Sequence, residues 1–457
     1  MKYIDKYKVC GLLGRGGMSK VFKVEMPVIG KIVALKLLDP SPLLLDLIGT
    51  DKIRAMFMTE AATMANLRHP NIVGVWDFGE ADGKLFYTMD YYCNNLGIII
   101  GETYQTEMES RIIKTEKAIH YIRQTLEGLT CLHHAAIIHR DIKPYNILIT
   151  EQDTVKICDF GLHKLRGESF EGPPNLKVGS PWYAAPEQEE APDAVNFSAD
   201  MYSVGMMLYR MLTGRLPQES PDSPGKYNPD LDEKWDSFIL KAIAPRSRHR
   251  FDNATEMLAG LVTLESDWQK KKERMCALDL PHNEKNENTD SCGGKPQILA
   301  LRNHCIKVAP KEAMTTFNLD RLWRPLRFVK NKFKFRSDGM VQDLLTGLIW
   351  QSAGTDFPVN WDNAGSYIKT LNSQKVAGHN NWRLPTIDEL LTLVSRTPHG
   401  EELCIEPVFD QKQKWLWSCD RRSFTAAWYV NMEMGFVSSN DFSSFYFAKG
   451  VCREQLG

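Results

Sequence analysis

Residues 139–146 carry several side chains that could act together on a phosphate ester. Asp141 offers a carboxylate that can accept a hydroxyl proton, and Lys143 places a cation two residues later. Asn146 and Asp159, the latter at the start of an Asp-Phe-Gly sequence, bear oxygen atoms of the kind that Mg²⁺ prefers. A proton acceptor, a cation and two metal ligands in this order meet the requirements of phosphoryl transfer from ATP.

These residues resemble the H-R-D-x-K-x-x-N and D-F-G motifs of eukaryotic-like protein kinases of the Ser/Thr type. Lys143 favours that type, because tyrosine kinases usually lack a Lys there. The resemblance implies an α+β, bilobal protein kinase fold over residues 1–268, with a β-rich N-lobe and a helical C-lobe. It implies that Asp141, Lys143, Lys36 and Glu60 act in catalysis, and that Asn146 and Asp159 bind Mg²⁺, with Mn²⁺ as an alternative.

The predicted N-lobe extends the resemblance. A Gly-rich loop starts at Gly14, with Ser19 in place of the third glycine of G-x-G-x-x-G. Lys36 matches the Lys that binds the α- and β-phosphates, and Glu60 matches its ion-pair partner. An apolar stretch at residues 43–45 lengthens the segment between these two. The residues expected to contact ATP are Leu13, Gly14, Gly16, Gly17, Val21, Ala34, Lys36, Met89, Asp90, Tyr92 and Leu148.

Further matches lie in the predicted C-lobe. Residues 179–187 resemble the G-T-x-x-Y-x-A-P-E segment, with Ser180 in place of Thr. Asp200 matches the buried carboxylate that anchors the catalytic loop, and Arg250 matches the Arg that pairs with the final Glu of that segment. The loop before it contains no Thr and one Ser, Ser169. We hypothesise that Ser169 or Ser180 is autophosphorylated; the alternative is a loop that needs no phosphate.

Two functions are compatible with these residues. The favoured one is an active protein-serine/threonine kinase in signal transduction, acting on protein substrates. The alternative is a nucleotide-binding scaffold with an inactive kinase lobe. Retention of Lys36, Glu60, Asp141, Asn146 and Asp159 favours the active kinase, since pseudokinases often lose one of the charged members of this set.

The bulk properties agree with this prediction. A chain of 457 residues can form two or three domains, and its net charge of −1 argues against a general nucleic-acid-binding protein. No apolar run approaches the roughly 18 residues that span a membrane. The Gly-rich loop begins too close to the N-terminus to leave room for a signal peptide. We therefore expect a cytoplasmic protein whose ten cysteines, which include no C-x-x-C pair, stay reduced.

The composition changes after residue 268. Residues 269–332 are charged and polar, and we expect a linker there. Residues 321–336 contain seven basic residues and no acidic one, a composition that suits nucleic acid or anionic lipid. The alternation in residues 332–336 favours a different interpretation, a half-buried strand with its cations outward.

Residues 333–457 hold six of the eleven Trp. Residues 338–351 predict strand, turn and strand; residues 361–372 predict a helix; residues 381–390 predict a strand that leads into a helix capped by Thr386. These patterns resemble the DUF1566 domain, also described as an Lcl C-terminal-like domain, which implies a loop-rich α+β, C-type-lectin-like fold of unknown ligand. We expect an input or targeting module. Its Trp side chains could line a ligand site, but packing is the expected role of most.

Overall fold

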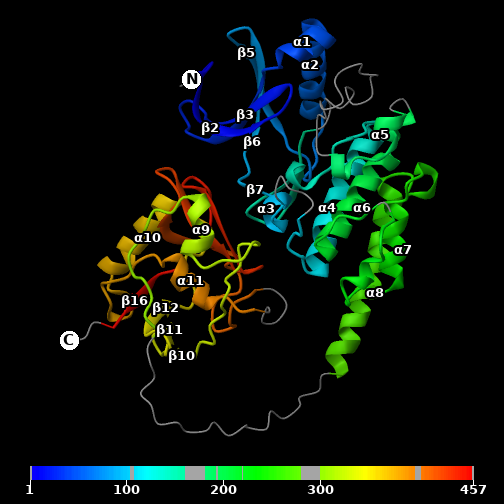
Figure 1. Cartoon of the computed structure of the whole chain (residues 1–457). Helices are drawn as coiled ribbons and strands as arrows, with labels where there is room; N and C mark the ends of the chain where they lie inside the picture. Colours follow the sequence, from blue (N-terminus) through cyan, green and yellow to red (C-terminus); the bar gives the residue numbers. More distant parts are fainter. Residues whose placement is uncertain are drawn as a thin grey trace. The chain divides into compact units, whose positions relative to one another are not determined.

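The computed structural model describes residues 3–102, 108–159, 181–191, 194–218, 220–278, 299–396 and 403–454. The chain divides into two compact units, residues 1–282 and 283–457 (Figure 1). Each unit has a buried apolar core of its own.

The first unit begins with an antiparallel sheet in the order β1-β2-β3-β4-β6-β5 (Figure 1). Its strands are β1 (Tyr3–Ile4), β2 (Tyr7–Arg15), β3 (Ser19–Glu25), β4 (Ile32–Leu38), β5 (Val75–Ala81) and β6 (Lys84–Asp90). Helix α2 (Thr50–Asn66) buries Phe57, Glu60 and Met64, the spacing expected of one helical face. The apolar stretch at residues 43–45 forms part of an added helix, α1 (Pro42–Ile48), whose N-cap is Ser41.

The rest of the first unit is mainly helical. Helix α6 (Ser198–Thr213) is buried along its length except at Tyr202. Gly205 allows α7 (Glu233–Ala242) to approach closely, because a Cβ there would lie 2.6 Å from the Cβ of Ala242. Residues 139–146, the predicted catalytic segment, follow α4 (Thr115–His134) in the chain and lead into β8 (Ile147–Ile149) of a small sheet. The helices are α3 (Leu96–Ile100), α4 (Thr115–His134), α5 (Glu187–Glu190), α6 (Ser198–Thr213), α7 (Glu233–Ala242) and α8 (Ala254–Leu278), with 3-10 turns at Pro144–Asn146, Pro181–Tyr183, Pro224–Lys226 and Ser247–His249; the sheet is β7 (Asn94–Asn95), β8 (Ile147–Ile149) and β9 (Val155–Ile157).

The second unit is β-rich. Its helices are α9 (Pro310–Thr316), α10 (Trp361–Ser373) and α11 (Ile387–Leu393), with a 3-10 turn at Val376–Gly378; one sheet has the order β10 (Phe333–Phe335), β11 (Met340–Asp343), β12 (Leu348–Gln351) and β16 (Val451–Arg453), and the other the order β13 (Trp415–Arg421), β14 (Ala426–Asn431) and β15 (Phe436–Asp441). The predicted strand–turn–strand and the helix at 361–372 are confirmed. So is the cap of α11, where Thr386 and Glu389 form a capping box. The strand predicted before α11 is reduced to a single bridge between Arg383 and Val451.

The predicted linker over residues 269–332 needs correction at both ends. Helix α8 continues to Leu278, and residues from 299 onward belong to the second unit. Val308, Ala313 and Phe317 lie in the buried core of that unit. The polar composition concealed this packing, because α9 contributes a single buried side chain and shows no periodic apolar face.

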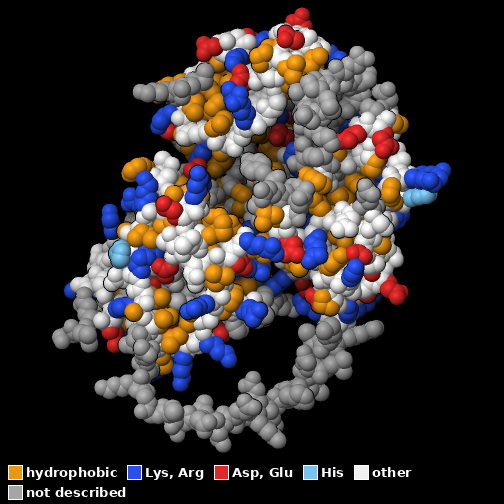
Figure 2. All heavy atoms as spheres, in the orientation of Figure 1, with side chains coloured by type: hydrophobic (Ala, Val, Ile, Leu, Met, Phe, Trp, Pro, Cys, Tyr) orange, Lys and Arg blue, Asp and Glu red, His pale blue; other side chains and the backbone are white. Residues whose placement is uncertain are grey.

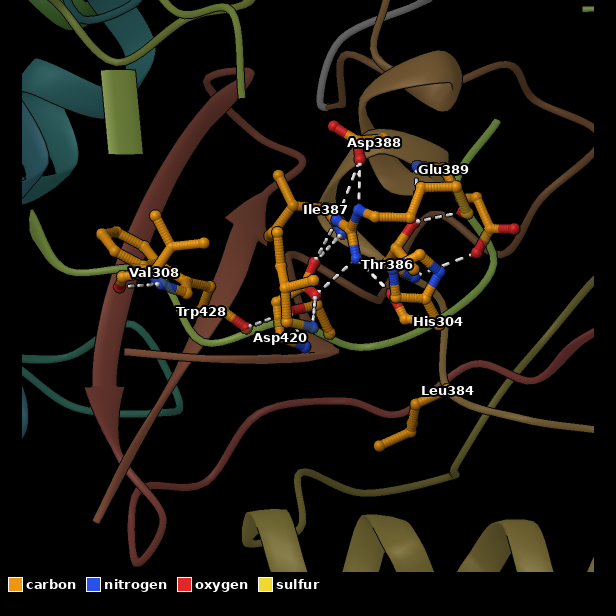
Figure 3. Close-up of polar contacts among 12 residues, drawn as sticks. His304, Val308, Leu384, Thr386, Ile387, Asp388, Glu389, Asp420 and Trp428 are labelled. Atoms are coloured by element: carbon orange, nitrogen blue, oxygen red, sulfur yellow. Dashed lines mark hydrogen bonds and ion pairs between the residues drawn. The ribbon is translucent and has the colours of Figure 1, made fainter. Parts of the chain in front are cut away.

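A network around Asp420 holds this added segment in place (Figure 3). Asp420 is fully buried, and each of its carboxylate oxygens accepts a hydrogen bond of 2.8 Å from the guanidinium of Arg302. The backbone N–H groups of Ile306 and Ile387 donate to the same carboxylate at 2.9 and 2.7 Å. Because Ile387 opens α11, one charged pair joins residues 302–306 to β13 and to the start of a helix.

Asp420→Asn should lower the free energy of unfolding of the second unit by about 1.5–3 kcal/mol, because it weakens the charged hydrogen bonds to Arg302 and leaves this guanidinium with Asp388 as its carboxylate partner. Urea unfolding followed by Trp fluorescence measures this loss. Asp338→Asn is the matched control, since Asp338 pairs with Arg336 near the surface and such pairs contribute about 0–1 kcal/mol. Equal losses in the two variants would contradict the role given to Asp420.

Candidate active site

Lys36 of β4 lies between two carboxylates. Its Nζ is 2.9 Å from Glu60 Oε1 on α2 and 2.7 Å from Asp159 Oδ1, just after β9. The hydroxyl of Tyr87 donates to Glu60 Oε1 at 3.2 Å. The pair of Lys36 and Glu60 therefore forms despite the helix α1 inserted between them in the sequence.

The opposite charges in this group counteract the effect of burial on the pKa values of Lys36 and Glu60. Burial alone would lower the pKa of Lys36, but Asp159 and Glu60 raise that pKa well above its usual value. Burial raises the pKa of Glu60, and the charge of Lys36 opposes that rise. Lys36 thus remains a cation near neutral pH, as a residue that binds phosphate oxygens must.

The catalytic loop places three predicted residues together. Lys143 Nζ lies 2.6 Å from Asp141 Oδ2. The Asn146 side-chain amide donates to the backbone oxygen of Asp141 at 2.8 Å and to its Oδ2 at 2.9 Å. Because the amide nitrogen makes both contacts, Oδ1 is the atom of Asn146 that could bind a cation.

The carboxylate of Asp200, on α6, holds the backbone of this loop in position. It accepts hydrogen bonds from the backbone N–H groups of His139 at 2.9 Å and Arg140 at 2.8 Å, and lies 2.9 Å from His133 Nε2. Burial would raise the pKa of Asp200, but the hydrogen bonds from His133 and from the backbone lower it. These bonds stabilise the left-handed backbone of Arg140, at φ 64°, directly before Asp141.

A second predicted pair is present in the C-lobe. The Arg250 guanidinium donates to both carboxylate oxygens of Glu187, at 2.6 and 2.9 Å. Phe160, Gly161, Ser169 and Ser180 lie outside the described residues, so the phosphorylation hypothesis stays a prediction.

The residues predicted to contact ATP lie on the strands around Lys36. Leu13, Gly14, Gly16 and Gly17 belong to the β2–β3 hairpin, where Gly16 N–H donates to Ser19 O at 2.8 Å. Val21 pairs with Lys36 across strands β3 and β4, and Ala34 pairs with Met89 across β4 and β6. The Asp90 side chain lies 3.2 Å from Lys31, Tyr92 is half-buried, and Leu148 is on β8.

Sequence reasoning missed two residues that position the site. Tyr87 supports Glu60, and His133 links Asp200 to the start of α8 by accepting a 3.2 Å hydrogen bond from Ala254 N–H. Tyr87 lies in the buried part of β6 and His133 on the buried face of α4, where a Tyr or His gives no sequence signal beyond packing.

The described residues of the second unit form no comparable site. Its Trp residues at 350, 382, 415, 417 and 428 are buried and Trp361 is half-buried, so packing is the role of most, as predicted. Within the described ranges, no cluster of His, Cys, Asp or Glu has metal-binding geometry. Cys404, Cys419 and Cys452 are present as thiols.

Lys449 is the unusual ionisable group of that unit. It is fully buried, and its Nζ donates to the backbone oxygens of Ser352 at 2.8 Å and Gln351 at 3.2 Å. Two acceptors match the two N–H groups of a neutral amine. Burial lowers the pKa of Lys449 to about 7, although Asp410 opposes the change.

Residues 7–319 match the family model described as the protein kinase domain, and residues 339–451 match the model described as the Lcl C-terminal domain. The first match covers more than half of the chain, so the chain belongs to the protein kinase family. The described helices include none long and apolar enough to cross a bilayer.

Named relatives extend this result. The chain is 30% identical over 289 residues to the probable serine/threonine-protein kinase PknB of Lactococcus lactis, covering 60% of this chain and 44% of that protein. It is 31% identical over 287 residues to the serine/threonine-protein kinase pkn3 of Myxococcus xanthus, covering 57% and 50%. The chain thus spans half or less of the length of these relatives. A solved PknI kinase domain of Mycobacterium tuberculosis, a double mutant, is 25% identical with a TM-score of 0.45 and covers 57% of this chain and 96% of that one.

The free energy of unfolding of the second unit should rise with pH between about 7 and 10.5. The pKa of Lys449 is about 7 when folded and near 10.5 when unfolded, so the unfolded chain binds more protons across this interval. Lys449→Met should remove this rise, and Lys412→Met, at an exposed position, should keep it. Urea unfolding at several pH values measures the slope; the same slope in wild type and Lys449→Met would refute the assignment.

Proposed function

We propose that this protein is a protein-serine/threonine kinase that transfers the γ-phosphoryl group of ATP to Ser or Thr hydroxyls of protein substrates. The observation that carries the proposal is the group formed by Lys36, Glu60 and Asp159. A 3.1 Å hydrogen bond between His139 Nε2 and the backbone oxygen of Cys158 connects this group to the loop of Asp141. The curated relatives, which are named as serine/threonine-protein kinases, support the same activity.

Each side chain has a role that its contacts permit. Asp141 would accept the proton of the substrate hydroxyl, with its carboxylate oriented by Lys143 and Asn146. Lys143 would balance the negative charge on the γ-phosphate oxygens, and Lys36, held by Glu60, would bind the α- and β-phosphates. Positioning and charge stabilisation account for most of the rate in such a site.

The donor set also fits the group that the reaction needs. Asn146 Oδ1 and the Asp159 carboxylate, whose side chain is 36% exposed, are hard oxygen ligands suited to Mg²⁺, with Mn²⁺ as an alternative. Bound ATP would supply the phosphoryl group, and the cation would offset the phosphate charge. The adenine ring of ATP would lie among Leu13, Val21, Ala34, Met89 and Leu148, near the backbone of residues 90–92.

Two wider proposals accompany the kinase. The second unit would be an input or targeting module with a C-type-lectin-like fold, which its small sheets and loop-rich connections support. The protein would act in the cytoplasm, where ATP is available and thiols stay reduced.

Asp141→Asn should reduce phosphate transfer by about 10²–10⁴-fold, because the substrate hydroxyl loses its proton acceptor. Transfer of labelled phosphate from ATP with Mg²⁺ to a protein substrate, followed by mapping of the modified residues, measures this. Asp338→Asn, a matched change in the second unit, should leave transfer unchanged. Binding of ATP by wild type without any transfer would instead establish a nucleotide-binding scaffold.

Glu60→Gln should lower kcat/KM for ATP by about 10- to 100-fold, since a hydrogen bond between charged groups contributes about 1.5–3 kcal/mol. Steady-state kinetics with varied ATP provide the measurement. Glu80→Gln removes a carboxylate that pairs with Arg54 on the exposed side of the same lobe and should have little effect. Similar losses in the two variants would show that Glu60 does not act through Lys36.

A further inference from the structure

Two cysteines of the second unit, Cys305 and Cys419, are far apart in the sequence but lie on segments that pair with each other. Lys307 forms a parallel bridge with Arg421 at the end of β13. The Arg421 N–H donates to the carbonyl oxygen of the residue before Lys307, and the Arg421 oxygen accepts from the residue after it, both at 2.9 Å. In a parallel pair, residues at equal steps along the two segments lie opposite each other. Two steps back from the bridge, Cys305 is therefore opposite Cys419.

The burial pattern places both thiols on the same side of this pair of segments. Ile306 packs against the core of the unit, whereas Cys305 before it is exposed. Burial also alternates over residues 418–421 of β13, where Asp420 is fully buried and Cys419 is partly exposed. Because successive side chains of an extended segment point to opposite sides, Cys305 and Cys419 share the side that faces away from the core.

The two thiols also influence each other electrostatically. Burial raises the pKa of Cys419, and the charges of Asp420 and Cys305 add to the rise. Cations are common on the surface of the second unit, as Figure 2 shows for the face that it draws. Two of its guanidinium groups, those of Arg383 and Arg302, lower the pKa of Cys419 and counter the rise in part. Cys419 thus remains a protonated thiol, and Cys305 is the member of the pair that solvent reaches.

The backbone around the pair suits a covalent bond. Paired strands lie about 4.7–4.9 Å apart, within the roughly 4.4–6.8 Å that separates the Cα atoms of disulfide-linked residues. The Asp420 carboxylate, next to Cys419, accepts a 2.9 Å hydrogen bond from the N–H of Ile306, next to Cys305. The two segments are therefore held side by side at the residues that adjoin both thiols.

We propose that Cys305 and Cys419 form a reversible disulfide when the protein is exposed to hydrogen peroxide. The exposed sulfur of Cys305 takes one oxygen from the peroxide, and water leaves, which gives a sulfenic acid. The sulfur of Cys419 then attacks the sulfur of Cys305: the S–S bond forms, the S–O bond breaks, and the hydroxyl departs as water with the proton of Cys419. Two thiols are oxidised, and one peroxide is reduced to two molecules of water.

This bond would make the second unit a redox-responsive module. It would join residues 302–308 covalently to β13, at the place where the Asp420 network holds them by hydrogen bonds. A transient bond of this kind is compatible with thiols that are reduced at rest, since most disulfides of cytosolic proteins are catalytic or redox-sensing. The proposal does not depend on the proposed kinase activity.

The test treats the full chain with hydrogen peroxide, blocks the remaining thiols with iodoacetamide and digests the protein with trypsin without a reductant. Trypsin releases Cys305 in residues 303–307 and Cys419 in residues 415–421. Mass spectrometry should find these two peptides joined, about 2 mass units below the sum of their masses, because two hydrogen atoms are lost. Dithiothreitol should separate them. A bond from Cys419 to Cys452 instead, or no joined peptides, would overturn the proposal.

Variants extend the test to stability. Cys305→Ser and Cys419→Ser should each abolish the joined peptides, whereas Cys10→Ser, a matched change at an exposed cysteine of the first unit, should leave them in place. In wild type, peroxide should raise the urea midpoint of the second unit by about 1–2 M, because the bond restricts the unfolded chain over a long loop. Both variants of the pair should lack this shift. The same shift in Cys305→Ser as in wild type would contradict the proposal, and circular dichroism checks that every variant is folded.

Discussion

The first unit depends on the burial of one cation, Lys36, between Glu60 and Asp159. A charged amine in the interior is stable only when opposite charges compensate its lost hydration. Glu60 comes from α2 and Asp159 follows β9, so the requirement ties the N-terminal sheet to a helix and to the segment beyond the catalytic loop. The interaction that stabilises the fold also sets the position of Lys36, the group that we propose binds the phosphates of ATP.

A second buried charge, Asp200, plays the corresponding part in the helical region. It holds the backbone of the catalytic loop through His139 and Arg140. His139 Nε2 in turn lies 3.1 Å from the backbone oxygen of Cys158, the residue before Asp159. The two ionic groups are therefore connected through a short chain of hydrogen bonds. Asp141 is attached to this chain by its backbone N–H, which donates to His139 Nδ1 at 3.2 Å.

The second unit also contains a buried ion pair, which here holds a segment of the chain in the fold. The carboxylate of Asp420 accepts hydrogen bonds from Arg302 and from two backbone N–H groups. These bonds attach residues 302–306 to the unit, although their polar composition predicts a linker. Aromatic side chains fill the remaining core, as in the stacking of Trp323 on Trp428. A small core of this kind leaves its last strand, β10, partly uncovered, which is why an apolar side chain such as Phe335 is exposed beside cations.

The sequence by itself predicted the reaction chemistry that we propose, and it determined several local elements. Residue types and spacing around Asp141 are restricted by phosphoryl transfer, and the cap at Thr386 is encoded within four residues. Tertiary structure decided what depends on distant partners: that Tyr87 supports Glu60, that residues from 299 onward pack on the second unit, and that Lys449 is enclosed. Such features follow from contacts between segments far apart in the chain, and the local hydrophobic pattern of the sequence does not indicate those contacts.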